Sequence, residues 1–244
     1  MFKNLSGYVL AAVTAVTTSM LATSSIAQDA QKDATAPEKA VGSGWSAQVS
    51  PDGTTGIALD EQQASAVRKV SDYFNDLKSL EGLFIQTGAD KKVMRGKFKM
   101  QQPGRFRFDY NRPSRQIIIS DGEYLAIQDL DLANEDRVAL DQTPFRILLR
   151  KDVDLLRDAL IMEVQESDDK ILLSLRDKSP DAPGLIKLVL AKTPEMTLKE
   201  WVTTDAQGLD TRVQIGKLKR DTEIAAEAFV IKSISRPFPG MRPE

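Results

Sequence analysis

Two pairs of aspartates have a spacing that could support chemistry. Asp129 and Asp131 lie two residues apart, which places both on one face of a β-strand, and Asp152 and Asp154 share that spacing. Paired carboxylates act as a general acid and base or as ligands of a divalent cation. Both pairs lie in an acidic stretch without the glycine-rich spacing of a cation-binding loop. The sequence therefore favours exposed carboxylates over an active site.

The composition excludes most other catalytic chemistry. The 244 residues include no histidine and no cysteine. Ser-His-Asp and Cys-His catalysis, histidine-based zinc sites, disulfides and a lipidated N-terminal cysteine are therefore excluded. The sequence also has no phosphate-binding glycine loop and no nucleophile elbow. We expect a protein that is not an enzyme and that uses no metal or cofactor, with a carboxylate-based hydrolase as the remaining enzymatic alternative.

A segment suited to binding is GKFKMQQPGRFRFDY, residues 96–110. Its cations Lys97, Lys99, Arg105 and Arg107 fall on one parity, and its apolar residues fall on the other. In strands these parities face opposite sides of the sheet. The apolar side is then either an ordinary core or the wall of a ligand site. The cationic side is either a solvated surface or a docking surface for a partner of opposite charge.

One helix and a series of strands would position these residues. Asp60, with Gln63 three residues later, has the pattern of a capping box and begins a helix over 60–80. After Gly82 the apolar periodicity changes to two, and the segment 143–160 returns to helical spacing. The expected strands are 83–88, 92–101, 104–111, 116–121, 124–130, 135–140, 161–167, 170–177, 185–193, 196–205 and 208–216, with a last one near 228–234.

Strands that follow one another in this way form an antiparallel sheet that curls strongly or closes. We therefore expect a mainly β fold, an incomplete (half-closed) antiparallel β-barrel of about 11 strands covered by the N-terminal helix and the short helical insert. Half-closed barrels with helices across the mouth hold apolar ligands, although a filled core has the same periodicity. The residues expected to line an apolar cavity are Phe84, Met94, Phe98, Met100, Phe106, Phe108, Leu125, Ile127, Phe145, Leu148 and Leu149.

The N-terminal region has the features of an exported protein. Lys3 precedes an apolar run over 8–21, and small residues at Ser25 and Ala27 suit cleavage after Ala27. The apolar run is shorter than a membrane-spanning helix, the alternative interpretation. We expect a signal peptide over 1–27, a disordered linker over 28–56, a single folded domain over 57–244, and a location in the periplasm.

The charges are distributed unevenly although the net charge is −2. Residues 91–115 contain nine Lys or Arg and one acid, whereas residues 116–169 contain fourteen acids and five Lys or Arg. Nucleic acid is a poor partner for the basic region, because the interleaved aromatics point away from the cations and could not stack on bases. The cations expected to dock a protein partner are Arg95, Lys97, Lys99, Arg105 and Arg107.

Three segments carry a resemblance to a known family. RGKFKMQQPGRFRFDYNRPSRQIIISDGEYLAI, TPFRILL and LKEWVTTDAQGLDTRVQI resemble, in order and spacing, the periplasmic outer-membrane lipoprotein carrier family of LolA type. The shared features include Gly96, Pro103, Phe106, Pro113 and the Asp121-Gly122 turn. The resemblance covers roughly residues 60–235.

The resemblance implies a function that needs no covalent chemistry. It implies a half-barrel whose cavity holds the acyl chains of lipoproteins, with Phe106 at the position of a cavity-lining Phe. The partners it implies are acylated lipoproteins, an inner-membrane ABC-type transporter that releases them, and an outer-membrane lipoprotein acceptor; we expect a monomer. One departure is Gln102, because the family usually has a basic residue there that helps to hold the lid.

Two other functions suit the same fold. The first is a regulatory module that senses envelope lipoproteins and passes the signal to a membrane partner. The second is a carrier of free lipids. Lipoprotein release from membranes would distinguish a carrier of lipoproteins from both.

Overall fold

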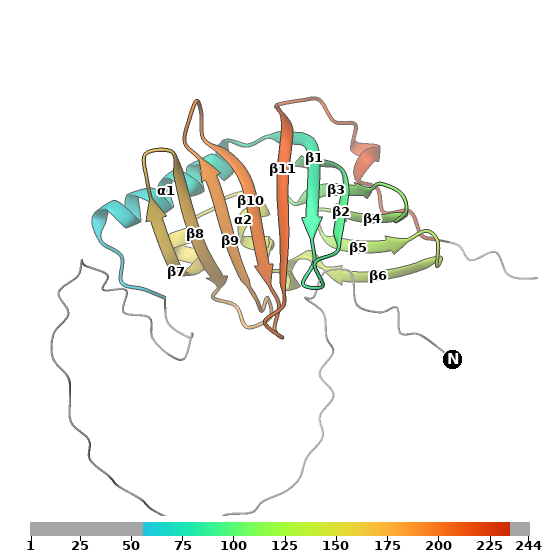
Figure 1. Ribbon diagram of the computed structural model, residues 1–244, viewed down its shortest axis with the longest axis horizontal. Coiled ribbons are helices and arrows are strands. Elements are labelled where there is room, and N and C mark those ends of the chain that lie inside the picture. Colours follow the sequence, from blue (N-terminus) through green and yellow to red (C-terminus); the bar gives the residue numbers. More distant parts are fainter. Residues whose placement is uncertain (1–55, 235–244) are drawn as a thin grey trace, which may run out of the picture.

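The folded part of the chain is one antiparallel sheet of eleven strands, described here from a computed structural model over residues 56–234. The strand order is β6-β5-β4-β3-β2-β1-β11-β10-β9-β8-β7, so β6 and β7 are the two edges of an open sheet (Figure 1). The expected incomplete barrel is confirmed. The strands are β1 Ser79–Thr87, β2 Val93–Gln101, β3 Arg105–Tyr110, β4 Gln116–Asp121, β5 Tyr124–Asp129, β6 Asn134–Ala139, β7 Ala159–Glu166, β8 Lys170–Asp177, β9 Leu185–Ala191, β10 Thr197–Thr204 and β11 Asp210–Arg220.

The order of the strands explains how the concave side is covered. β1 pairs with β11, so the first and last strands meet in the middle of the sheet. The chain between the edge strands β6 and β7 must therefore cross from one edge of the sheet to the other. This connection contains η1 (Leu140–Gln142), α2 (Arg146–Leu149) and α3 (Leu155–Asp158). We call residues 143–149, which begin this crossing, the lid.

The helix α1 (Glu61–Asp76) begins where the sequence predicts. Asp60 accepts a hydrogen bond from the Gln63 backbone N–H at 2.7 Å, and the Gln63 side chain accepts one from the Asp60 N–H at 3.0 Å. This capping box satisfies N–H groups that the first helical turn leaves unpaired. The apolar face of α1, including Val67, Val70 and Phe74, is buried in the core.

α1 is too short to cover the whole sheet. Sixteen residues form a helix about 24 Å long, whereas eleven strands about 4.8 Å apart span roughly 48 Å. Figure 1 shows α1 beside the β7 to β9 part of the sheet, while β3 to β6 run across the direction of the other strands. The concave side of β1 to β5 is therefore left to the lid.

The C-terminal part of the described chain corrects one expectation. A last strand near 228–234 is wrong, because this segment contains the 3-10 helix η2 (Ala226–Phe229) and otherwise irregular backbone. η2 contacts β3 and β4, and its Phe229 is buried. Ile119 of β4 is also buried and alternates with the cavity-lining Ile118, so this part of the sheet is covered on its convex side too. A side chain that packs on a strand does not need to be in one.

The expected helical insert over 143–160 is present but broken into short pieces. α2 ends at Leu149, and Asp154 caps the separate helix α3 by accepting a hydrogen bond from the Arg157 N–H at 3.1 Å. The expected signal peptide, most of the expected linker and residues 235–244 lie outside the described residues. Within residues 56–234, no helix has the length and apolar character needed to cross a membrane.

Candidate ligand-binding site

An apolar cavity of about 100 Å³ lies between the concave face of the sheet and the lid. It is bordered by α1, the lid and strands from both sides of the β1–β11 pair, and it is partly open to the outside. Its walls consist almost entirely of aromatic and aliphatic side chains. The lining residues are Phe74, Leu80, Gln86, Phe98, Met100, Phe106, Phe108, Tyr110, Ile118, Leu125, Phe145, Leu148, Leu149, Leu188, Leu198, Trp201, Thr203, Thr211, Val213 and Ile215.

Most of the residues predicted to line a cavity do line it. Three do not, namely Phe84, Met94 and Ile127. The Phe84 ring is buried behind the wall and lies over Gly96, where a Cβ would come within 2.6 Å of the ring. Gly96 is therefore required for this close approach. The predicted residues found in the wall are Phe98, Met100, Phe106, Phe108, Leu125, Phe145, Leu148 and Leu149.

The part of the wall that the prediction missed comes mainly from β9 to β11. Trp201 of β10 and Leu188 of β9 also face inward, but only the pairing of β11 with β1 joins their strands to the sheet that contains β2 and β3. Phe74 comes from the last turn of α1. The polar members Gln86, Thr203 and Thr211 gave no cavity signal, because the alternating pattern selects apolar residues.

Phe108 is at the centre of the aromatic wall. Its ring stacks on Phe98 with 5.6 Å between ring centroids and meets Trp201 edge to face at 6.1 Å. It also meets Phe84 at 5.1 Å and Phe106 at 6.0 Å, both edge to face. These offset and edge geometries are the favourable ones for aromatic pairs. The wall is thus a continuous aromatic surface on β2 and β3 that extends to Trp201 of β10.

The end of the lid is fixed to the β2–β3 turn by two hydrogen bonds. The Gly104 N–H donates to the Leu149 carbonyl at 2.7 Å, and the Gln102 side-chain amide donates to the Leu148 carbonyl at 3.0 Å. Gln102 thus contacts the lid from the position where the resemblance leads us to expect a basic residue. A neutral donor replaces a cation there, and its own Oε1 is buried without a partner among the described residues.

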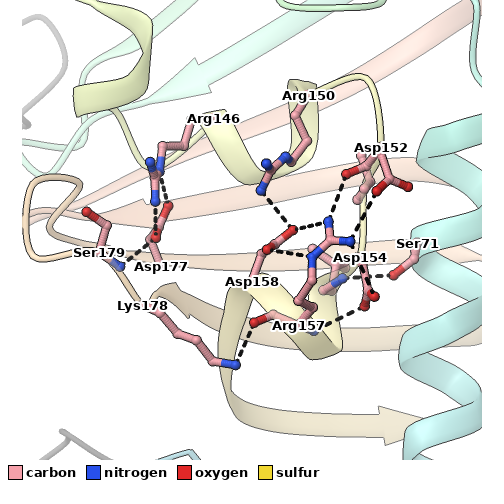
Figure 2. A network of polar contacts seen from close by, with 12 residues as sticks. Ser71, Arg146, Arg150, Asp152, Asp154, Arg157, Asp158, Asp177, Lys178 and Ser179 are labelled. Carbon is pink, nitrogen blue, oxygen red and sulfur yellow. Dashed lines mark hydrogen bonds and ion pairs between the residues drawn. The ribbon is translucent and has the colours of Figure 1, made fainter.

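The other side of the lid is fixed by an ion pair (Figure 2). Arg146 donates to both carboxylate oxygens of Asp177, with Nη2 2.8 Å from Oδ1, and the Asp177 side chain has 0% exposure. Asp177 also accepts a hydrogen bond from the Ser179 N–H at 2.7 Å. The hydrogen bond to Asp177 raises the pKa of the Arg146 guanidinium. Arg146 therefore stays charged and ties α2 to the end of β8.

The Asp152 and Asp154 pair is part of a separate ion cluster beside the lid. Arg157 bonds to the Asp152 carboxylate at 3.1 Å and to Asp158 at 2.9 Å, and Arg150 also pairs with Asp158 at 2.9 Å (Figure 2). The hydrogen bond from Arg157 is the main reason that the pKa of Asp158 is lowered. These acids are neutralised by arginine, which gives them a structural role.

The Asp129 and Asp131 pair also has a local role. The Asp129 carboxylate accepts hydrogen bonds from the N–H groups of Asp131 at 2.9 Å and Leu132 at 3.0 Å, as in an Asx turn. Asp131 pairs with Arg115 at 3.4 Å. Among residues 56–234 no cluster of three or more acidic side chains could hold a metal ion.

The predicted docking cations divide into two groups. Arg95, Lys97 and Lys99 are exposed on β2, on the face opposite the cavity. Arg107 is instead paired with Asp109 at 2.8 Å, and it donates to the Ala228 carbonyl of the C-terminal segment at 3.4 Å. Arg105 is half-buried and donates to Gln101 at 3.4 Å. The cationic surface available to a partner is therefore centred on β2.

The profile of the family described as "Outer membrane lipoprotein carrier protein LolA" matches residues 75–232, more than half of the chain. The chain belongs to the LolA family. The family match includes every strand and the lid.

Individual relatives agree with this family assignment. The outer-membrane lipoprotein carrier protein of Halorhodospira halophila is 28% identical over 182 residues, which cover 71% of this chain and 84% of that protein. The corresponding protein of Neisseria meningitidis serogroup B is 35% identical over 102 residues, or 39% of this chain and 49% of that protein. A solved structure, the LolA superfamily protein from Nitrosomonas europaea, is similar with a TM-score of 0.40 and 10% identity, covering 69% of this chain and 98% of that one.

Proposed function

We propose that the chain is a periplasmic carrier that binds the acyl chains of lipoproteins in the apolar cavity and transfers them toward the outer membrane. The observation that carries the proposal is an apolar cavity bordered by a lid on a LolA-family half-barrel. The relatives carry the name of outer-membrane lipoprotein carriers, and such carriers are chaperones without catalytic activity. The two aspartate pairs have structural partners, which agrees with a protein that performs no covalent step.

The energetics explain why such a carrier needs a large apolar surface. A triacyl anchor has on the order of 40 CH₂ groups, and each contributes roughly 0.8 kcal/mol when removed from water. Exposing the anchor would therefore cost about 30 kcal/mol. A carrier that moves the anchor through water must shield most of it without forming a bond that has to be broken later.

The size of the cavity implies that loading moves the lid. A cavity of about 100 Å³ has room for roughly seven to ten groups the size of a water molecule. This is less than one long acyl chain. The lid contributes Phe145, Leu148 and Leu149 to the wall, and few polar contacts hold it. Its displacement widens the cavity and makes room for the ligand.

Docking to the donor and acceptor of lipoproteins would use the exposed cations of β2. Arg95, Lys97 and Lys99 follow one another on the convex face and lie beside the half-exposed Leu83 and Ile85 of β1. An acidic surface on the inner-membrane transporter or on the outer-membrane acceptor would complement this strip. We expect reversal of these three charges to slow transfer while leaving acyl binding unchanged.

The proposal is tested by release of lipoproteins from spheroplasts. The purified chain without residues 1–27 is added to spheroplasts, and the supernatant is probed for triacylated lipoproteins. The informative variant is Met100→Gln, because Met100 is half-buried in the cavity wall. Met94→Gln is the matched control on the same strand, half-buried but outside the wall. Phe106→Glu is a poorer probe, since Phe106 is only 6% exposed and an unpaired carboxylate there would destabilise the fold.

We expect release by the wild type and by Met94→Gln, and reduced release by Met100→Gln. Circular dichroism and urea unfolding establish that each variant is folded. Absence of release by the folded wild type would contradict the carrier proposal. Equal release by both variants would contradict the assignment of the cavity as the acyl site.

A further inference from the structure

The apolar cavity contains one group of polar side chains. Gln86, Tyr110, Thr203 and Thr211 all contribute to the wall. They gather at the same end of neighbouring strands, because Thr203 pairs with Thr211, and Gln86 pairs with Val213, two residues further along β11. Polar groups that are few and close together in an apolar pocket usually fix the orientation of a ligand.

Gln86 and Tyr110 are the buried members of this group. Gln86 is 5% exposed and Tyr110 is 8% exposed. The Tyr110 hydroxyl donates to Oε1 of Gln86 at 2.5 Å. Burial raises the pKa of the Tyr110 hydroxyl well above its ordinary value, so the hydroxyl stays protonated and remains a donor.

This hydrogen bond leaves one end of the amide free. Within residues 56–234 it is the only hydrogen bond of the Gln86 side chain. The amide NH₂ group, which can donate twice, therefore has no acceptor in an otherwise apolar wall. The nitrogen of this amide is not among the fully buried polar atoms without a partner, so it is accessible from the cavity that Gln86 lines. A ligand in the cavity can therefore accept a hydrogen bond from it.

The two threonines extend the polar group toward the outside. Thr203 and Thr211 are half-buried, whereas Gln86 and Tyr110 are buried. The Thr203 hydroxyl donates to the Thr211 carbonyl at 3.4 Å. A ligand with a polar group at one end of an apolar chain would thus find a continuous polar strip beside an apolar wall.

We propose that Gln86 and Tyr110 form a subsite that binds an ester carbonyl of the diacylglyceryl group, with the Gln86 amide N–H as donor. The inference rests on the proposed function, because it assigns one polar contact to the acyl ligand already placed in the cavity. An ester carbonyl is a strong acceptor attached directly to an apolar chain. An ether-linked chain of the same length has the same apolar surface and no carbonyl.

The test compares two soluble lipids that differ only in this group. The probes are 1,2-dioctanoyl-glycerol, which has ester carbonyls, and 1,2-dioctyl-glycerol, which has ether links. Each displaces a fluorescent apolar dye from the purified protein. One net hydrogen bond predicts that the wild type prefers the ester about threefold to tenfold. In Gln86→Met, which keeps the length of the side chain, we expect the ester to lose this advantage and the ether to bind as before.

Gln214→Met is the matched control, because Gln214 lies on the adjacent strand β11 and is exposed. It should keep the preference for the ester. Equal affinity of the wild type for the two lipids overturns the subsite while leaving the carrier intact, as does an unchanged preference in Gln86→Met. Binding of neither lipid overturns the acyl site itself. The wild-type comparison decides the question even where Gln86→Met does not fold.

Discussion

The two ends of the concave surface are built from the same alternating sequence pattern but are filled differently. On β7 and β8, which we call the filled half, residues such as Ile171, Leu173 and Leu175 have 0% exposure and none lines the cavity. On β1 to β5, which we call the cavity half, Met100 and Phe108 are only half-buried although they face inward. α1 contacts β7 in the filled half, whereas the lid covers the cavity half.

The difference shows that the cover decides whether an apolar sheet face becomes core or cavity. Branched aliphatic side chains under a regular helix can interlock at the density of a protein interior. Rigid aromatic rings under a short, irregular lid leave space between them. The cavity is therefore a consequence of a helix that spans about half the width of its sheet.

The largest contrast between the halves should appear in stability. Leu173→Ala in the filled half should lower the free energy of unfolding by about 2–5 kcal/mol, because the cavity it creates cannot collapse. Met100→Ala in the cavity half should cost about 1 kcal/mol, since Met100 is half-buried and already borders empty space. Urea unfolding at 25 °C measures both values. Equal losses would mean that the two halves are packed alike.

A smaller effect is expected at the lid. Arg146→Met leaves the carboxylate of Asp177, whose side chain has 0% exposure, with the Ser179 N–H as its one remaining partner among residues 56–234. We expect a loss of about 2 kcal/mol, because breaking a buried pair strands one charge, moderated here by the partial exposure of Arg146. Hydrogen exchange at the amides of residues 146–149 should become faster.

Arg150→Met is the matched control for the lid. Its partner Asp158 keeps Arg157, so both the stability and the exchange at 146–149 should change little. If Arg146→Met exchanged no faster than this control, Arg146 would not hold the lid.

The smallest effect concerns the ion pairs that join α1 to the filled half. Glu166 of β7 pairs with Lys192 at 2.8 Å and with Lys69 of α1 at 2.9 Å, and these hydrogen bonds lower its pKa below the ordinary 4.5. The folded state thus favours the charged form of Glu166. The stabilisation by these ion pairs is complete above the ordinary pKa of 4.5 and is lost as the pH falls through the lower pKa of the folded state.

Glu166→Gln should therefore cost about 0.5–1 kcal/mol at pH 7, because ion pairs near solvent are screened. The difference from the wild type should shrink on acidification below pH 4.5 and in 1 M salt. Thermal unfolding as a function of pH measures it. A difference that persists at pH 3 would mean that the contribution of Glu166 is not electrostatic.

Local sequence patterns predicted most helices and strands, whereas the pairing of strands that are distant in the sequence determined how the cavity wall is assembled. β4 and β8 have the expected bounds because turn residues flank each strand at both ends. β1 begins at Ser79 and not at 83, because helical and strand periodicities overlap there. The apolar segment near 228–234 predicts a strand, but Phe229 packs on the sheet from the 3-10 helix η2 and the residues after it have irregular backbone.

The same limit applies to the site. Alternation on β2 and β3 revealed Phe98, Phe106 and Phe108, since parity alone decides which side chains face inward. The opposite wall comes from residues 188–215, and the pairing of β1 with β11 brings it into place. The alternating pattern could not predict Gln86 as a cavity residue, because a polar residue at an inward-facing position interrupts the alternation of apolar and polar residues.

The central claim, that the cavity half and not the filled half receives acyl chains, is tested most directly by photocrosslinking. A diacylated lipopeptide with a diazirine in the middle of one acyl chain is bound to the wild-type protein, irradiated, and mapped by mass spectrometry. We predict labels on residues 98–108 and 145–149, which supply much of the cavity wall. Labels concentrated on residues 161–175 of β7 and β8, with none on β2 or β3, would contradict the account.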